Sequence, residues 1–215
     1  MQFIDLKKQQ DMIREKLDQR IAGVLSHGRY IMGPEVTELE EKLAEFVGVK
    51  HCISCSSGTD ALLIPLMAKG IGVGDAVLTT PFTYIATAEV IRLVGATPVF
   101  VDIDRDTFNM NSKLIPEALQ LAVEKGLNPK AIIPVDLFGL PAVYGQIEKV
   151  AKEYGLFVLE DTAQGFGGEI HEKKAGSFGD VAATSFFPAK PLGCYGDGGA
   201  IFTDDDSLVE KMISI

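Results

Sequence analysis

The first 48 residues carry apolar positions at helical spacing. Between residues 13 and 25, isoleucine and leucine recur every four positions, with charged side chains between them. A glycine-containing loop follows, and Pro34 then begins a second amphipathic segment that ends at Gly48. The pattern predicts two helices, and we expect residues 1–34, the first helix and its loop, to stand apart from residues 35–215.

From residue 50 onward, short β-branched runs alternate with helical stretches. This alternation predicts an α/β domain of three layers, in which helices flank a mostly parallel sheet. No helical pattern separates the last two runs, which leaves room for a mixed sheet. We predict strands at 51–54, 76–79, 98–102, 131–135, 156–160, 181–187 and 199–203, and helices at 61–68, 85–94, 114–124 and 143–154.

The charge balance argues against two classes of partner. The chain has 30 acidic and 20 basic residues, a formal net charge of −10. Such an excess repels nucleic acid and anionic membranes. The amino-terminal residues lack the basic and apolar regions of a signal peptide, and no run approaches the roughly 18 apolar residues of a membrane span. We expect a cytoplasmic protein that binds neither nucleic acid nor membrane.

Two of the three cysteines, Cys52 and Cys55, have the CxxC spacing of redox and zinc sites. They fall in a predicted strand, where side chains three apart point to opposite faces and cannot bond to each other. No second CxxC completes a zinc site. We therefore interpret them as structural cysteines and expect no metal.

Chemically suggestive residues follow four of the predicted strands, where open α/β sheets bind ligands. Residues 56–59 read Ser-Ser-Gly-Thr before a helix, which suits an anion site or an ordinary capped turn. Residues 81–84 read Pro-Phe-Thr-Tyr; an aromatic ring there could stack on a flat ligand or pack in the core. The sequence alone leaves both pairs of alternatives open.

The other two strand ends carry an acid and a lysine. Glu160 and Asp161 end an apolar run, and a carboxylate there could hold a pyridinium nitrogen protonated, bind a metal or cap a helix. Lys190 leaves an apolar strand near the glycine-rich residues 196–199, where desolvation would make its amine nucleophilic, although most lysines are solvated charges. An anion site, an aromatic ring, an acid and a lysine match the phosphate, ring face, ring nitrogen and aldehyde carbon of pyridoxal phosphate.

Segments that run in order over most of the chain resemble the DegT/DnrJ/EryC1/StrS family of pyridoxal-phosphate-dependent sugar aminotransferases. They are residues 57–62, 81–83, 101–104, 160–164, 185–190 and 196–199. The resemblance implies the large domain of the fold-type I transferases. It also implies that Gly58, Thr59 and Ser185 hold the phosphate, Phe82 stacks on the ring, Asp161 pairs with the ring nitrogen, Gln164 contacts the ring hydroxyl and Lys190 is the catalytic Schiff-base lysine.

The resemblance carries expectations about substrate and assembly as well. Residues 3–6, 30–35 and 190–195 are similar to a branch that aminates the 3-keto form of UDP-N-acetylglucosaminuronic acid for bacterial O-antigen. It implies a nucleotide-sugar substrate, an amino-acid donor that we expect to be glutamate, and a homodimer. Asp136 replaces a histidine that is frequent in the family, and we assign it no role.

Family members continue into a second, carboxy-terminal domain, so the resemblance implies that this small domain is absent here. The alternative function is a truncated, catalytically incomplete cofactor-binding or regulatory module. A fold-type I lyase would use the same cofactor set. A nucleotide-dependent oxidoreductase is the weakest alternative, because its glycine fingerprint is absent.

Overall fold

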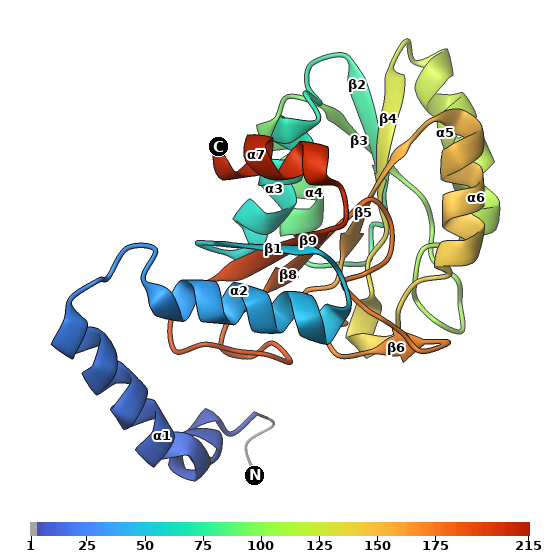
Figure 1. The fold of residues 1–215 in the computed structure, drawn as a ribbon. Coiled ribbons are helices and arrows are strands. Elements are labelled where there is room, and N and C mark those ends of the chain that lie inside the picture. Colours follow the sequence, from blue (N-terminus) through green and yellow to red (C-terminus); the bar gives the residue numbers. More distant parts are fainter. Residues whose placement is uncertain (1–3) are drawn as a thin grey trace.

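A seven-stranded sheet forms the centre of the molecule (Figure 1). The computed structural model describes residues 4–215, so Phe3, at the start of the motif in residues 3–6, lies outside the described residues. The strand order is β1-β9-β8-β5-β4-β2-β3. The strands are β1 (His51–Cys55), β2 (Asp75–Thr79), β3 (Thr97–Phe100), β4 (Asn128–Ile133), β5 (Phe157–Asp161), β8 (Val181–Ser185) and β9 (Gly199–Thr203).

The sheet is parallel except at β9. Neighbouring strands from β3 to β8 pair in parallel, whereas β9 lies antiparallel between β1 and β8. Thr203 pairs with His51 on one side and with Val181 on the other. The predicted α/β class and the mostly parallel sheet are confirmed, and the chain reverses direction in the loop of residues 186–198 between the last two large strands.

Helices cover both faces of this sheet. In Figure 1, β1 and β9 lie between α7 above and α2 below. Helices α3, α4 and α7 pack on one face, and α2, α5 and α6 on the other, which gives the three predicted layers. The helices are α1 (Leu6–His27), α2 (Pro34–Val47), α3 (Gly58–Ala68), α4 (Ala86–Leu93), α5 (Ile115–Glu124), α6 (Tyr144–Tyr154) and α7 (Asp206–Ile213), with 3-10 turns η1 (Ser112–Leu114) and η2 (Leu137–Gly139).

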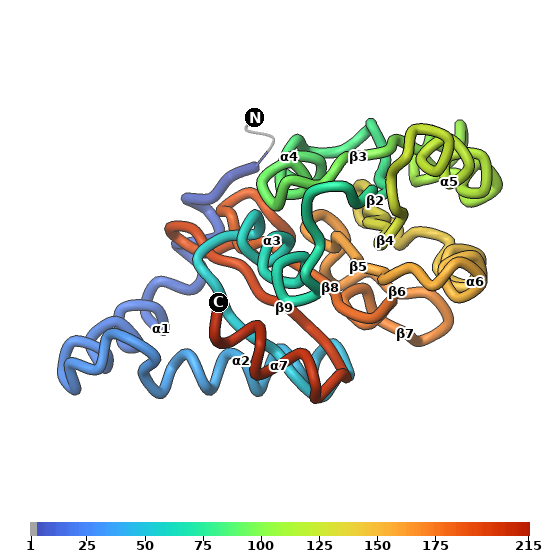
Figure 2. Tube along the Cα trace, turned by 90° about the horizontal axis from the view of Figure 1, so that it is seen from above, coloured from blue at the N-terminus to red at the C-terminus, as the bar shows by residue number. Residues whose placement is uncertain are grey.

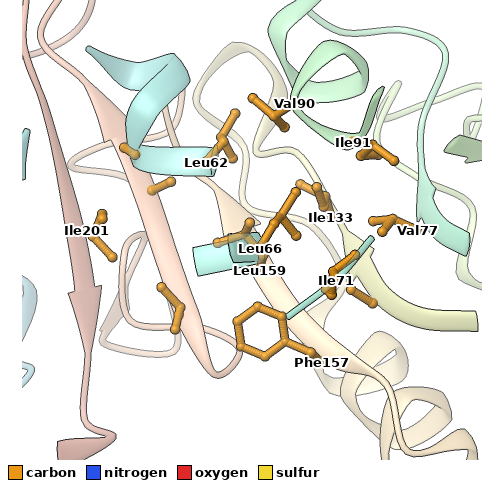
Figure 3. Packing of buried hydrophobic residues seen from close by; sticks show 14 of the residues in the cluster. Leu62, Leu66, Ile71, Val77, Val90, Ile91, Ile133, Phe157, Leu159 and Ile201 are labelled. Carbon is orange, nitrogen blue, oxygen red and sulfur yellow. The ribbon is translucent and has the colours of Figure 1, made fainter. Parts of the chain in front are cut away.

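Side chains that alternate along the strands build a separate core on each face. On the α3 side, Leu66, Val77 and Leu159 are fully buried between helices and sheet (Figure 3). Leu78 and Val158, one position away from Val77 and Leu159, face α5 and α6 instead. This two-residue period fixes which side chains at each strand end point toward which face.

Helix α1 extends away from the sheet (Figures 1 and 2). It begins at a capping aspartate, Asp5, whose carboxylate accepts from the Lys8 N–H, and it ends at Gly28 in the left-handed conformation. None of its residues is buried. The division into residues 1–34 and 35–215 stays a prediction, although this arrangement agrees with it.

Several elements were not predicted. A small hairpin, β6 (Glu169–Ile170) and β7 (Lys173–Lys174), follows β5, and α7 closes the chain. Cys52 and Cys55 lie in β1 as predicted and are free; burial raises the pKa of the Cys52 thiol to about 12. Within residues 4–215, no helix has the length and apolar content that a membrane span requires, and no three acidic, histidine or cysteine side chains group as metal ligands.

Candidate functional site

A cavity of about 340 Å³ opens where β5 and β8 end and α3 and α4 begin. This is the carboxyl edge of the parallel strands, where the sequence predicted ligand binding. Its size lies within the range of small-molecule sites. The lining residues are Ser57, Gly58, Thr59, Leu62, Thr83, Tyr84, Ala86, Thr87, Asp161, Ala163, Gln164, Ser185, Phe187, Ala189, Lys190 and Asp197.

One end of the cavity is the amino terminus of α3. Ser57 caps this helix, because its hydroxyl accepts from the Asp60 N–H at 3.1 Å. Gly58 and Thr59 follow with backbone N–H groups that have no partner inside the helix. A Cβ on Gly58 would lie 2.4 Å from the Ser185 Cβ, so only glycine lets these two segments meet. Gly58, Thr59 and Ser185 thus come together as predicted, at a place suited to an anion.

Asp161 stands deeper in the cavity and is only 4% exposed. Its Oδ2 accepts from the Thr87 hydroxyl at 2.8 Å, and its Oδ1 accepts from the Ala163 N–H at 3.2 Å. Burial raises the pKa of Asp161, while these two hydrogen bonds and the charge of Lys190 oppose that rise. The site therefore holds a buried carboxylate whose charged form has donors and one nearby lysine.

Lys190 lines the same cavity from the loop after β8. Its backbone N–H donates to the Phe187 carbonyl at 2.8 Å, which closes a tight turn. Its Nζ lies 5.9 Å from the centre of the Tyr84 ring, within the range of a cation–π contact. The lysine and the acid predicted for opposite ends of one ligand ring thus face one cavity.

Gln164 also lines the cavity, at the start of the loop after β5. Its Oε1 accepts from the backbone N–H of Phe138 at 3.3 Å. Phe138 has a left-handed backbone with φ of 54°, which is uncommon for a bulky residue. A strained turn between β4 and α6 thereby fixes the Gln164 side chain.

Phe82 is not brought into this cavity. It lies among other aromatic rings, with centroid distances of 5.8 Å to Phe108 and 6.3 Å to Phe138. Tyr84, two residues further along, lines the cavity instead. The backbone after β2 is an irregular bend, so the alternation of a strand no longer fixes which ring points inward. Tyr84 thus lines the cavity where Phe82 does not, and the stacking role of Phe82 stays a prediction.

Thr87 and Asp197 carried no prediction from the sequence. Thr87 is a polar residue on the buried face of the amphipathic helix α4, and that position is the sequence signal for it. Asp197 lies within the glycine-rich turn of residues 196–199. Both side chains lie in the cavity wall.

A family model described as the DegT/DnrJ/EryC1/StrS aminotransferase family matches residues 11–215. The chain belongs to this family. The family uses pyridoxal phosphate. Recognition of the family from the ordered segments of the sequence is confirmed.

Several known proteins are similar to the chain over its whole length. A UDP-2-acetamido-2-deoxy-3-oxo-D-glucuronate aminotransferase of Pseudomonas aeruginosa is 55% identical over 215 residues, which cover 100% of this chain and 58% of that protein. A crystal structure of a family aminotransferase from Brucella abortus superposes with a TM-score of 0.98 at 55% identity, again covering 100% and 58%. The Bacillus subtilis protein NtdA, solved with bound cofactor PMP, gives a TM-score of 0.88 at 32% identity and covers 100% and 47%. The chain therefore spans about half the length of these relatives.

The residues present suit the cofactor of the family. A phosphate would meet the free N–H groups of α3, with Gly58 packed closely enough on Ser185 to exclude any larger residue. A protonated ring nitrogen would neutralise the buried charge of Asp161. Tyr84 and Ala163 would line the space that the ring fills, and Lys190 would supply an amine for the aldehyde carbon.

Proposed function

We propose that this chain is the cofactor-binding part of a cytoplasmic aminotransferase that uses pyridoxal phosphate and acts on nucleotide-linked keto-sugars in bacterial surface-polysaccharide synthesis. One observation carries the proposal: Lys190 and Asp161 face the same cavity, whose far end is the amino terminus of a helix. Pyridoxal phosphate requires a lysine for its aldehyde carbon, an acid for its ring nitrogen and an anion site for its phosphate.

Each side chain has a defined task in this function. When bound, the cofactor supplies an electron sink that accepts the electron pair left when a proton is removed beside the amino group. Asp161 keeps the ring nitrogen protonated, and its Thr87 hydrogen bond favours the ionised carboxylate. The Lys190 amine would hold the aldehyde carbon of the cofactor, and as a free amine it would carry a proton as base and then as acid. Tyr84 would contact the ring from the cavity wall.

The proposed substrates are glutamate as amino donor and UDP-3-keto-N-acetylglucosaminuronic acid as acceptor. The Pseudomonas aeruginosa protein that is 55% identical over the whole chain is named for the same 3-oxo sugar. A second cavity supports a site for a larger ligand beside the first, because the two share Gln164, Ala189 and Lys190. Its other walls include Leu6 and Phe138.

The proposed assembly is a homodimer. Helix α1 has no buried residue, and its Met12 side chain is 81% exposed. In the loop that follows the helix, the Ile31 side chain is 90% exposed. Large apolar side chains that gather on one projecting element favour burial against another protein surface. Sedimentation equilibrium of the chain tests this, and the replacement of Met12 and Ile31 by serine should shift the distribution toward monomer.

The decisive experiment is a titration of the chain with pyridoxal phosphate, followed by borohydride reduction and peptide mapping. We expect a visible absorption band and a reduced adduct on Lys190. Lys190→Ala should abolish both the adduct and transfer from glutamate, because no other amine lines the cavity within residues 4–215. Lys130→Ala, on the exposed part of β4, is the matched control.

Three outcomes would contradict the proposal in different ways. Amino transfer by the Lys190→Ala variant would remove Lys190 from its role. An adduct on another lysine would move the site. Cofactor binding without transfer from any amino acid would favour a binding or regulatory module instead of an enzyme.

A further inference from the structure

Two carboxylic acids lie buried directly behind the proposed cofactor site. Asp136 and Glu160 are both 0% exposed. They come from neighbouring parts of the sheet, because β4 pairs with β5 and the Asp136 N–H donates to the Asp161 carbonyl at 3.0 Å. Glu160 precedes Asp161 in β5 and points to the opposite face of the sheet. No role in the proposed reaction accounts for this pair.

Three of the four carboxylate oxygens of the two acids accept hydrogen bonds. Asp136 Oδ1 accepts from the Ala142 N–H at 3.0 Å and from the Tyr144 hydroxyl at 2.8 Å. Glu160 accepts from the Gly176 N–H at 2.5 Å and from the Phe178 N–H at 2.7 Å. Asp136 Oδ2 alone is buried with no N–H or hydroxyl donor among the described residues.

Glu160 is the candidate for the missing donor, because both acids are fully buried on the same face of neighbouring strands. Each of the two carboxyl groups also shifts the pKa of the other. Two ionised carboxylates have no proton to share and repel one another, whereas one proton between them supplies the bond and removes one buried charge. Burial first, and then the neighbouring acid, raise the pKa of Glu160; burial raises the pKa of Asp136 to about 6.

Within residues 4–215, no lysine, arginine or histidine forms an ion pair with either acid. Tyr144 and Asp161 are the other titratable groups that act on Asp136. On the β6–β7 side, the Lys173 Nζ lies 4.8 Å over the Phe178 ring, and that ring stacks on Tyr144 at 4.5 Å. The two aromatic rings thus stand between this lysine and the acids, and Lys174 pairs with Glu169.

We propose that Asp136 and Glu160 hold one proton between them and act as a positioning pair for the loop that carries Gln164. The positioning role rests on the proposed function, because it concerns a loop that lines the cofactor cavity. The shared proton does not depend on that function.

The pair joins three segments around the cavity. Asp136 fixes the turn of residues 137–142 through the Ala142 N–H, and that turn contains Phe138, whose N–H donates to Gln164. Glu160 fixes residues 176–178. A Cβ on Gly165 would lie 2.4 Å from the Asp136 Cβ, so the backbone next to Gln164 packs directly on the acid. Loss of the shared proton would set two charges against each other at the point where these segments meet.

The shared proton is tested by the pH dependence of the free energy of unfolding, measured on the full chain in urea without added cofactor. In Asp136→Asn, the amide oxygen can accept the Ala142 and Tyr144 bonds and the amide nitrogen can donate to Glu160, so no proton is needed. A folded acid that keeps its proton when the unfolded chain has lost it makes stability fall as pH rises. From pH 5 to 8 we expect the folding constant of the natural chain to fall about tenfold more per pH unit than that of Asp136→Asn.

Two further variants sharpen this result. Asp106→Asn makes the same chemical change at an exposed site and should keep the natural pH slope. Glu160→Gln should lose the slope but lower stability at every pH, because the Gly176 and Phe178 N–H groups donate to different oxygens of Glu160 and the amide nitrogen of Gln cannot accept either bond. Equal slopes for the natural chain and Asp136→Asn would overturn the shared proton. A protonated-carboxyl C=O band in the infrared spectrum that disappears in Asp136→Asn is the independent readout.

The positioning role is tested by cofactor affinity at pH 7. Asp136→Asn should bind pyridoxal phosphate within about twofold of the natural chain, and folded Asp136→Ala about tenfold more weakly, since only the first keeps the turn fixed. Equal affinity of these two variants would overturn positioning. If the natural chain itself does not bind the cofactor, the proposed function fails, while the pH slopes still decide the shared proton.

Discussion

The hydrogen bond from Thr87 to Asp161 allows the proposed charge of the site to be tested with a change of very few atoms. Thr87→Val replaces the hydroxyl by a methyl group of similar size in a fully buried position. The hydroxyl has one proton and two acceptors in reach, the Asp161 carboxylate at 2.8 Å and the Tyr84 carbonyl at 3.1 Å. The carboxylate is the stronger acceptor, and the Thr83 hydroxyl at 3.0 Å can in turn donate to Thr87.

The size of the effect follows from the strength of a buried bond to a charged group. Such a bond contributes about 1.5–3 kcal/mol, which is about 10- to 100-fold in a dissociation constant. The bond stabilises the ionised carboxylate, so its removal raises the pKa of Asp161 beyond the rise that burial already causes. The acid then loses its charge at a higher pH than before. The loss of cofactor affinity should therefore grow as the pH falls.

The assay is equilibrium dialysis of pyridoxal phosphate against the natural chain, Thr87→Val and Thr87→Ser at pH 6, 7 and 8. Thr87→Ser keeps the hydroxyl and loses only a methyl group, so its affinity should stay within about fourfold of that of the natural chain, the cost of one buried methyl. An unchanged affinity of Thr87→Val at all three pH values would refute the reasoning. So would equal losses in the valine and serine variants, which would indicate packing and not hydrogen bonding.

Two further predictions concern the ends and the face of the cavity. Gly58→Ala should lower the free energy of unfolding by about 1–3 kcal/mol in urea, because its Cβ meets Ser185, whereas Gly145→Ala, with nothing within 4 Å, should not destabilise the chain. Tyr84→Leu should weaken cofactor binding by about 0.5–1.5 kcal/mol and Phe82→Leu by less, as dialysis can measure; the reverse order would restore Phe82 as the stacking residue.

The architecture was predictable because the signals for it are local. Each of the seven large strands overlaps a β-branched run of the sequence, and Gly28, Pro34 and Gly48 mark helix boundaries as expected. Strand order was not predictable in the same way. The placement of β9 between β1 and β8 joins residues about 150 positions apart, as in the pair His51 and Thr203, and no local pattern encodes that pairing.

The candidate site was predictable wherever a side chain follows directly from a strand or helix end. Asp161 is the last residue of β5, and Gly58 is the first residue of α3, so the elements themselves deliver them to the cavity. The direction of the Phe82 ring was not predictable in this way, because Phe82 lies beyond the end of β2, where the bends of the chain decide where its ring points.

The alternation of the strands also explains why two adjacent acids have different tasks. Leu159 faces α3 and α4, so Asp161, two residues later, faces the same side and meets Thr87 of α4. Glu160 faces the opposite side with Val158. That much follows from a period of two. The partner of Glu160 does not, because Asp136 lies past the end of β4 at Ile133, where regular pairing has given way to a single bridge between Val135 and Asp161. The sequence can therefore show which acid serves the cavity, while the acid that shares a proton behind it emerges only from the folded chain.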